Sequence, residues 1–194
     1  LAEGTNIIKL YDTAGNVTEQ EFVIDWTAPV VNVKEYIGQN PYSGASFKLS
    51  DNNLIDYFEL NGKKYDRTNA KYSDANYDNI KASLKNGQNK LVLYDAAGNS
   101  TTYEFELERV APTITVSNGT IGSGPYRKLN LKMHDASGIA SVVINGTKLP
   151  HTGTYVDIND GHAYTFQQGT NTVTVMDKAG NTVTKTFEVD RNTI

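Results

Sequence analysis

Hydrophobic residues recur at every second position through much of this chain. Leu129, Leu131 and Met133 alternate with polar residues, and Val173 and Val175 alternate with threonines. Because successive side chains of a β-strand point to opposite faces of the sheet, each such strand has one apolar and one polar face. Strands of this kind are typical of antiparallel sheets that bury one face and expose the other to water. No segment shows a convincing helical period, so the pattern predicts an all-β fold.

Turn-forming residues interrupt the alternation about every 8 to 12 residues, which is typical of a β-sandwich. Within the last part of the chain, this spacing predicts about seven strands. They are expected near 112–117, 127–133, 139–145, 147–149, 162–167, 171–176 and 182–189.

The chain also repeats itself. A Gly-x-Asn motif, an alternating apolar run and an Asp-x-Ala-Gly-Asn motif occur in this order three times. The last asparagines of the three copies, Asn16, Asn99 and Asn181, are separated by 83 and 82 residues. Residues 51–62 align onto residues 135–146 without a gap. A constant period over this length indicates tandem modules.

The period is too long for a solenoid repeat of roughly 20 to 50 residues and fits a small β-domain. Ala28-Pro29 and Ala111-Pro112 open the units, which predicts two modules at 29–110 and 111–194. Residues 1–28 match only the C-terminal hairpin of a further module, so the chain looks like a cut from a longer array. We expect tandem immunoglobulin-like antiparallel β-sandwiches of about seven strands each.

A lone hairpin is marginal in water. The apolar face of residues 1–28, formed by Ile8, Leu10, Phe22 and Ile24, is therefore expected to be covered. The second module, the sheet edge of a neighbouring chain, or strands exchanged between chains could provide the cover. Trp26 is expected to pack into the junction that follows.

The Asp-x-Ala-Gly-Asn motif has the chemistry of a hairpin turn. Its aspartate can accept hydrogen bonds from backbone N–H groups two or three residues on, and its glycine can adopt a positive φ. The asparagine can help the chain re-enter the next strand. We therefore assign structural turn roles to Asp12, Gly15, Asn16, Asp95, Gly98, Asn99, Asp177, Gly180 and Asn181.

The order Gly-x-Asn, Asp-x-Ala-Gly-Asn, Phe-x-Val-Asp and Ala-Pro resembles the bacterial immunoglobulin-like repeats of Gram-positive surface and secreted proteins. The best copy runs from Gly169 to Asp190. Residues 52–54 depart from the pattern, because they read Asn-Asn-Leu where the third copy has Ala-Ser-Gly. The resemblance implies a β-sandwich that acts as a spacer, stalk or accessory module, and it implies no single ligand and no catalytic residue.

Composition excludes several classes of function. The 194 residues carry a net charge of −4 and contain no cysteine, which excludes disulfides, thiol catalysis and zinc–thiolate sites. A pI of about 5.4 argues against nucleic acid, which usually draws a basic patch. No apolar run approaches the roughly 18 residues of a membrane span, so no membrane insertion is expected.

No constellation in the sequence points to catalysis. His134, His151 and His162 have no counterparts at the equivalent positions of residues 29–110. A sandwich of about 80 residues rarely offers the cleft that paired carboxylates need. We therefore predict no catalytic residue and no enzyme.

Two acidic segments have the oxygen ligands that Ca²⁺ prefers. One contains Asp74, Asn76 and Asp78, with the acid spacing that opens an EF-hand loop but without its glycine and closing glutamate. The other contains Asp157, Asn159 and Asp160 near the aligned place. Solvated turns are the expected reading, with no cofactor, and Ca²⁺ is the alternative.

Tyrosines concentrate in the middle module, which holds eight of the twelve. Aromatic faces stack on sugar rings and anchor protein interfaces, but tyrosine is also a good strand residue. The candidate binding residues are Tyr42, Tyr57, Tyr72 and Tyr77, with Tyr57 facing outward beside Phe58 and the last two in a longer loop.

These observations favour a non-catalytic region of an extracellular protein, secreted or anchored in the cell wall. Its partners would be neighbouring immunoglobulin-like modules of the same protein. One alternative is a module that binds a glycan or a host surface protein through the tyrosine-rich loops of 29–110. Another is an accessory region of a large secreted hydrolase or cell-envelope protease.

Overall fold

A computed structural model describes residues 1–118 and 124–192, without the side chains of residues 68 and 69. The chain divides into two compact units. The first unit comprises residues 1–35, 46–84 and 88–105, and the second comprises residues 36–45, 85–87 and 106–194. Each unit is described by itself below.

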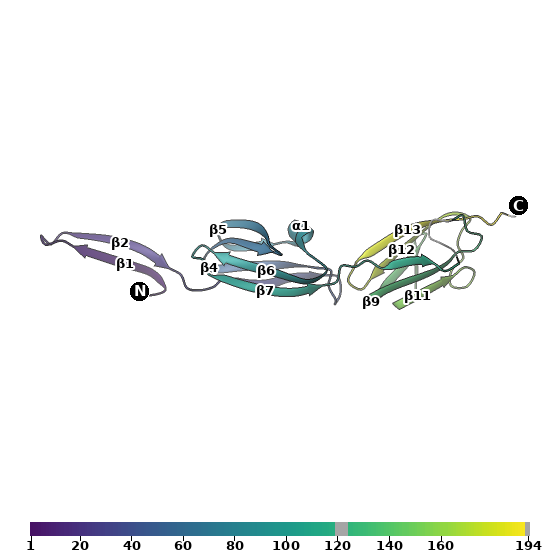
Figure 1. Cartoon of the computed structure of the whole chain (residues 1–194), viewed down its shortest axis with the longest axis horizontal. Helices are drawn as coiled ribbons and strands as arrows, with labels where there is room; N and C mark the ends of the chain where they lie inside the picture. Colours follow the sequence, from purple (N-terminus) through teal and green to yellow (C-terminus); the bar gives the residue numbers. More distant parts are fainter. Residues whose placement is uncertain (119–123, 193–194) are drawn as a thin grey trace. The chain divides into compact units, whose positions relative to one another are not determined.

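Strands hold most of the described residues and helices very few, which confirms the all-β prediction (Figure 1). The helical residues form one short α-helix, α1 (Tyr77–Ile80), and one turn of 3₁₀-helix, η1 (Lys81–Ser83). The strands are β1 (Gly4–Tyr11), β2 (Val17–Ile24), β3 (Val30–Ile37), β4 (Gly44–Leu60), β5 (Lys63–Ala75), β6 (Gly87–Asp95), β7 (Ser100–Leu107), β8 (Thr113–Val116), β9 (Asn130–Ile144), β10 (Thr147–Leu149), β11 (Gly153–Asn159), β12 (Gly169–Asp177) and β13 (Thr182–Val189).

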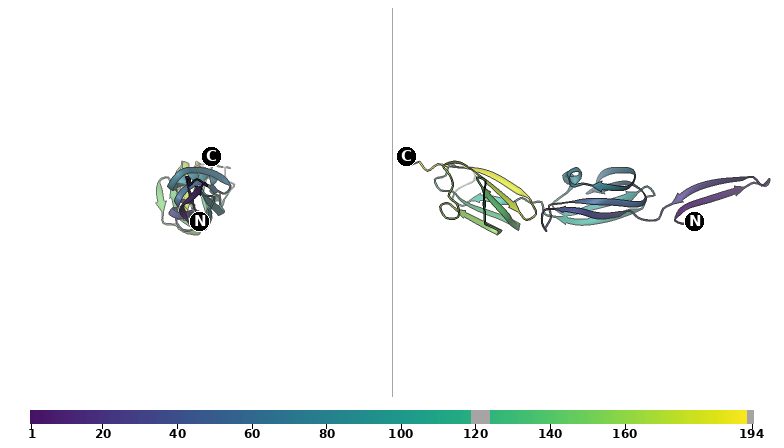
Figure 2. Two further views of the ribbon diagram at one scale, coloured as in Figure 1. Left: turned by 90° about the vertical axis from the view of Figure 1, so that its left-hand side faces the viewer. Right: turned by 180° about the vertical axis from the view of Figure 1, so that it is seen from behind.

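In the second unit, the long strand β9 takes part in both layers of an antiparallel sandwich (Figure 2). Its first half, 130–134, pairs with β8 and β11, and its second half, 139–144, pairs with β12 and in part with β10. β13 extends the second layer beyond β12. Alternate residues of both layers, among them Met133, Val142 and Val175, meet in one buried cluster. The alternation that predicts strands therefore also builds this core.

Strand β4 has the same role in the other sandwich. Residues 47–50 pair with one part of β5, while residues 57–60 pair with both β5 and β6. The sheet order is β3-β4-β6-β7, with β5 added on β4. Phe47, Phe58 and Leu93 are fully buried in its core. In the last module, β9 thus replaces two of the separate strands expected from the sequence, those near 127–133 and 139–145.

One predicted strand is wrong. Residues 162–167 form a turn and irregular segment, and the strand of this region is β11, 153–159. Phe166 is buried at 2% exposure, so its segment has a buried apolar residue without being a strand. In β11, Val156 and Ile158 are buried while their neighbours are exposed, which is the alternation of a half-buried strand.

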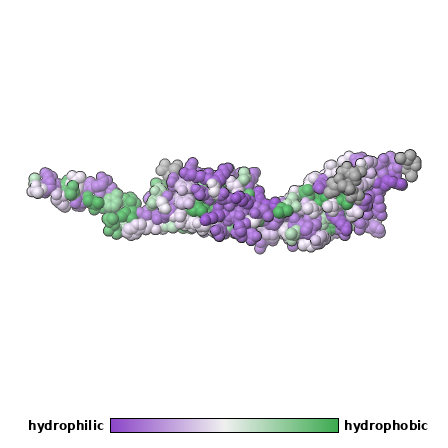
Figure 3. All heavy atoms as spheres, viewed as in Figure 1, coloured by the Kyte–Doolittle hydropathy of each residue, from purple (hydrophilic) through white to green (hydrophobic). Residues whose placement is uncertain are grey.

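Strands β1 and β2 form a regular hairpin with eight paired positions (Figure 1). Ile8 is 55% exposed and Leu10 is 71% exposed, whereas Phe22 and Ile24 are half-buried. Hydrophobic atoms are visible along the hairpin in Figure 3. The expected cover is therefore not supplied to Ile8 and Leu10 by the described residues, and contact with another chain stays a prediction. Trp26, expected to be packed, is 62% exposed.

The two Asn-containing motifs of the repeat bond to each other. Asn145, at the left-handed position of the Asn-Gly turn between β9 and β10, donates from Nδ2 to Oδ1 of Asn171 at 2.8 Å. Asn171 is fully buried and also bonds the backbone of Gln167 and Gly169. The other sandwich repeats this pair between Asn61 and Asn89 at 2.8 Å. The Gly-x-Asn motif thus holds a hairpin turn against the start of the following strand.

We expect Asn171→Ala to lower the free energy of unfolding of the second unit by about 2 kcal/mol, because it leaves buried polar partners without hydrogen bonds. Urea denaturation measures the loss. Asn159→Ala, at an exposed position of β11, is the matched control and should change stability by less than about 0.5 kcal/mol. Equal effects of the two substitutions would contradict the role given to Asn171.

Candidate functional site

Each copy of the Asp-x-Ala-Gly-Asn motif forms a turn around its aspartate. Oδ1 of Asp95 accepts hydrogen bonds from the backbone N–H groups of Ala97 at 2.9 Å and Asn99 at 2.8 Å. Asp12 accepts the equivalent pair, and Asp177 accepts from Asn181. The acceptors therefore serve residues two and four positions on. The three glycines, Gly15, Gly98 and Gly180, have φ between +87° and +93°.

The asparagine that ends the motif reaches a second segment of the chain. Nδ2 of Asn99 donates to Oδ2 of Asp95 at 2.8 Å and to the carbonyl of Asp25 at 3.1 Å. In the second unit, Nδ2 of Asn181 donates to the carbonyl of Glu108 at 3.2 Å. Asp25 and Glu108 occupy equivalent positions, three residues before an Ala-Pro. The turn therefore lies beside the acid that precedes its own module.

Two carboxylate triads result, one in each unit. Asp25, Asp51 and Asp95 each place an oxygen within 4.8 Å of the others, and so do Glu108, Asp135 and Asp177. Each triad combines the acid before Ala-Pro, the Asp-x-Ala-Gly-Asn aspartate, and an aspartate from the long strand. Asp51 and Asp135 lie where the pairing of β4 and β9 is interrupted. These are acidic clusters that could hold a metal ion.

The carboxylates of both triads lie against like charges in a partly dehydrated environment. Burial raises the pKa of Asp51, and the neighbouring charges of Asp25 and Asp95 raise it further. Burial likewise raises the pKa of Glu108, with the charges of Asp177 and Asp135 acting in the same direction. A cation bound among these carboxylates would act in the opposite direction, because positive charge favours the ionised form.

Sequence reasoning missed the triads because it searched for ligands in contiguous segments. Asp51 and Asp135 appear in the ungapped alignment of 51–62 with 135–146, and Asp95 and Asp177 appear in the turn motif. Repetition of all three acids could have singled them out. Their proximity could not be read in advance, since it depends on where the long strand bends.

In the first predicted metal segment, lysine side chains pair with the aspartates. Asp74 is in β5 and Asp78 is in α1, with Asn76 between them. Nζ of Lys34 bonds Asp74 at 2.6 Å and Asn76 at 3.0 Å. Asp78 pairs with Lys81 at 3.0 Å. The segment is therefore not a free loop, and its acids already have cationic partners.

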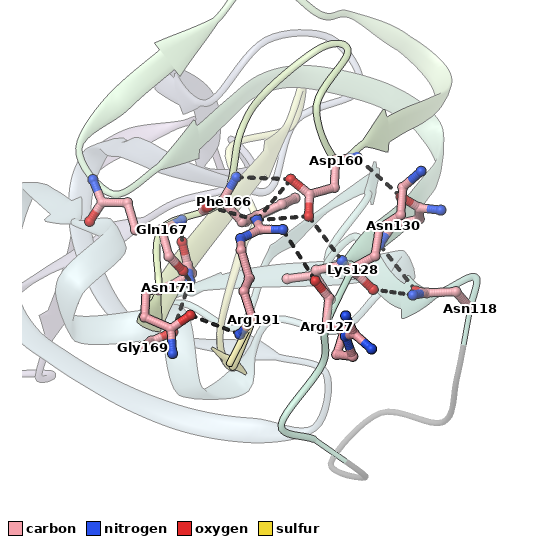
Figure 4. A network of polar contacts seen from close by, with 12 residues as sticks. Asn118, Arg127, Lys128, Asn130, Asp160, Phe166, Gln167, Gly169, Asn171 and Arg191 are labelled. Carbon is pink, nitrogen blue, oxygen red and sulfur yellow. Dashed lines mark hydrogen bonds and ion pairs between the residues drawn. The ribbon is translucent and has the colours of Figure 1, made fainter. Parts of the chain in front are cut away.

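The second predicted metal segment is divided between two environments. Asp157 and Asn159 are exposed residues of strand β11, which corrects the prediction of a loop. Asp160 is buried, and its carboxylate contacts Nη2 of Arg191 at 2.9 and 3.1 Å (Figure 4). It also accepts the backbone N–H groups of Leu129 and Phe166. Arg191 thus supplies the positive charge at this place.

The candidate tyrosines of the first unit do not gather into one face. Tyr57 stacks on Tyr94 at 4.5 Å, with Nζ of Lys64 4.2 Å from its ring centre. Tyr72 lies in β5 and is 78% exposed. Tyr77 is half-buried at the start of α1 and donates its backbone N–H to Ser46. The expected longer loop at Tyr72 and Tyr77 is thus a strand and a helix, because β5 continues along β4.

Tyr42, in the second unit, stacks on Tyr36 at 4.1 Å and lines a pocket of about 490 Å³. Glu108, His134 and Asp135 also line it. The ring centroids of His134 and Tyr155 lie 4.3 Å apart. A smaller pocket of about 270 Å³ has Glu59, Asn61, Gly62, Lys90, Val92 and Tyr94 in its walls.

No family model matches this chain. The chain is similar to a staphylococcal adhesin. The "Serine-rich adhesin for platelets" of Staphylococcus aureus is 29% identical over 181 residues, or 92% of this chain, in strains MRSA252 and USA300. The chain spans only 12% and 7% of the lengths of these two relatives. The match therefore shows similarity to a segment of an adhesin.

Solved structures resemble the chain more remotely. Fibronectin(III)-like modules of Clostridium thermocellum CbhA give a TM-score of 0.30 at 12% identity, covering 82% of this chain and 93% of that one. A 1.5-MDa bacterial ice-binding adhesin gives 0.28 at 16% identity, covering 97% and 74%. Bacteroides ovatus SGBP-B, solved with a mixed-linkage heptasaccharide, gives 0.29 at 19% identity, covering 98% and 54%. At these TM-scores the likenesses carry no argument.

Within the described residues, no helix is long and apolar enough to span a bilayer.

Proposed function

We propose that this chain is a non-catalytic region of immunoglobulin-like repeats that acts as a spacer, stalk or adhesion module of a bacterial surface or secreted protein. The observation that carries the proposal is the similarity to an adhesin along 92% of the chain. Neighbouring immunoglobulin-like modules of the same protein are the proposed partners, and the proposed location is extracellular. A role beside a secreted hydrolase or protease would be decided by the full-length reading frame.

The recurring geometry at the end of each copy supports the spacer role. The side chain that precedes Gly-x-Asn accepts the backbone N–H of the residue after the terminal acid. Glu3 accepts from Trp26 at 2.9 Å, and Gln168 accepts from Arg191 at 2.8 Å. Asn86 accepts from Arg109 at 2.7 Å. Each copy thus closes its last hairpin with the same kind of hydrogen bond.

A binding role is the second candidate, favoured by the exposure of Tyr72. A tyrosine ring open to solvent on a regular strand can stack on a sugar or enter a pocket of a partner protein. The curated relatives are named for platelets, so the proposed ligand is a glycan or a host surface protein.

Binding of the purified chain to a glycan array and to platelets separates the two candidates. The spacer role predicts no saturable binding at millimolar glycan or on platelets. Saturable binding that is lost in Tyr72→Ala would establish the second candidate instead. Tyr11→Ala is the matched control, because Tyr11 is an exposed tyrosine of β1 outside residues 29–110. Loss of binding in both variants would contradict a site at Tyr72.

A further inference from the structure

We propose that Asp25, Asp51 and Asp95 of the first unit form a Ca²⁺ site. The three carboxylates come from separate segments: Asp25 follows β2, Asp51 lies in β4, and Asp95 ends β6. They are 9%, 7% and 2% exposed, respectively. One oxygen from each lies within 4.8 Å of the other two, so a single ion could contact all three.

Two of the carboxylate oxygens point independently to a ligand. Oδ2 of Asp25 and Oδ1 of Asp51 are buried and have no hydrogen-bond partner among the described residues. Buried acceptors in this condition are uncommon and call for an ion or water. Asp25 and Asp51 are each more than nine-tenths buried.

The remaining oxygens hold the side chains in place. Oδ1 of Asp25 accepts from the backbone of Thr27 at 3.1 Å, and Oδ2 of Asp51 accepts from the backbone of Asn53 at 2.8 Å. Each of these two aspartates therefore uses one oxygen to fix its orientation and leaves the other free. This division is what a preorganised ion site requires.

The chemistry of the cluster selects the ion. The ion pairs of Lys9, Lys34, Lys64, Lys81 and Arg191 are made with other carboxylates. An all-oxygen ligand set suits hard cations. Ca²⁺ accepts six to eight oxygens in flexible geometry, whereas Mg²⁺ demands a near-ideal octahedron. Glu3 lies close by, since Nδ2 of Asn52 bridges it to Asp25, and adds to the negative charge.

The second unit's triad provides a contrast. There Nδ2 of Asn181 donates to Oε2 of Glu108 at 2.9 Å and to Oδ2 of Asp177 at 2.8 Å. Oδ1 of Asp135 accepts from Ser137 and Gly138. No oxygen of this triad is among the buried unpartnered atoms of the described residues, so the proposal is confined to the first unit.

Trp26 allows the site to be observed directly. It is the single tryptophan of the chain and adjoins Asp25. Tb³⁺ replaces Ca²⁺ in oxygen-ligand sites and emits when a nearby indole transfers energy to it. We expect Tb³⁺ emission on selective excitation of Trp26, displaced by Ca²⁺ and far less by Mg²⁺. The emission should be lost in Asp51→Asn and kept in Asp74→Asn, a matched change in the same unit.

A stability measurement guards against misfolded variants. Ca²⁺ at about ten times its dissociation constant should raise the melting temperature of the first unit by roughly 7 °C. In chelator, Asp51→Asn should melt no lower than the unaltered chain, because it removes a like charge, and Ca²⁺ should no longer shift it. A melting temperature lowered equally with and without Ca²⁺ would show a structural role only and overturn the proposal. Absence of Trp26-sensitised emission, or its loss in Asp74→Asn alone, would overturn it as well.

Discussion

Phe58→Ala is expected to lower the free energy of unfolding of the first unit by about 4 kcal/mol. Phe58 is fully buried in the half of β4 that pairs on both sides, with Leu93 of β6 opposite it on one side and Tyr65 of β5 on the other. Its ring stacks on that of Tyr65 at 4.7 Å. Removing the ring loses its transfer free energy and leaves a cavity that the two neighbouring strands cannot close.

The preceding residue supplies the control for urea denaturation followed by circular dichroism. Tyr57 points to the opposite face of β4, is half-buried, and stacks on Tyr94. Tyr57→Ala removes a ring of similar size and should cost about 1 kcal/mol. Equal losses in the two variants would mean that Phe58 does not occupy the core position assigned to it.

The contrast between Phe58 and Tyr57 follows from the sequence alone, because alternation decides which of two adjacent residues faces inward. The same reasoning predicts the all-β fold and strands at β12 and β13. The continuity of β4 and β9 could not be predicted, since polar residues such as Asn53 and Ser137 read as turn signals. In the structure these residues lie where one long strand passes between layers, and Asp51 and Asp135 accept their N–H groups.

The error at 162–167 has a related cause. Phe166 is an apolar residue next to alternating neighbours, but it enters the core from a loop. Its backbone N–H is satisfied by a side chain, Asp160, at 3.2 Å. Phe166 is therefore buried like a strand residue, although its backbone N–H bonds a carboxylate and not a neighbouring strand. Periodicity detects burial, and it cannot tell which partner satisfies the backbone.

The candidate sites divide along the same line. A search of short sequence segments predicts metal sites at 74–78 and 157–160, where acidic residues are close together in sequence. In the structure those acids are paired with lysine and arginine or lie exposed on a strand. The triads instead combine acids that are far apart in sequence. Only the fold of the long strand and the turn brings them together.

Asp160→Ala is expected to destabilise the second unit by about 3 kcal/mol. The Asp160 side chain is 3% exposed and accepts four hydrogen bonds from three nitrogens: the backbone N–H groups of Leu129 and Phe166, and Nη2 of Arg191, which contacts both carboxylate oxygens (Figure 4). Its removal leaves the two backbone donors without a partner. Arg191, at 38% side-chain exposure, can turn to water and recover part of its solvation, which keeps the loss below that of a fully buried pair.

Denaturation of three variants resolves these contributions. Asp157→Ala makes the same change three residues earlier, at an exposed position of β11, and should alter stability by less than about 0.5 kcal/mol. Asp160→Asn retains an acceptor but loses the charge, so its effect should fall between the other two. If Asp160→Ala were no worse than Asp157→Ala, the network around Asp160 would not stabilise the fold. Because Arg191 already neutralises Asp160, added Ca²⁺ should not change the melting temperature of the second unit in either alanine variant.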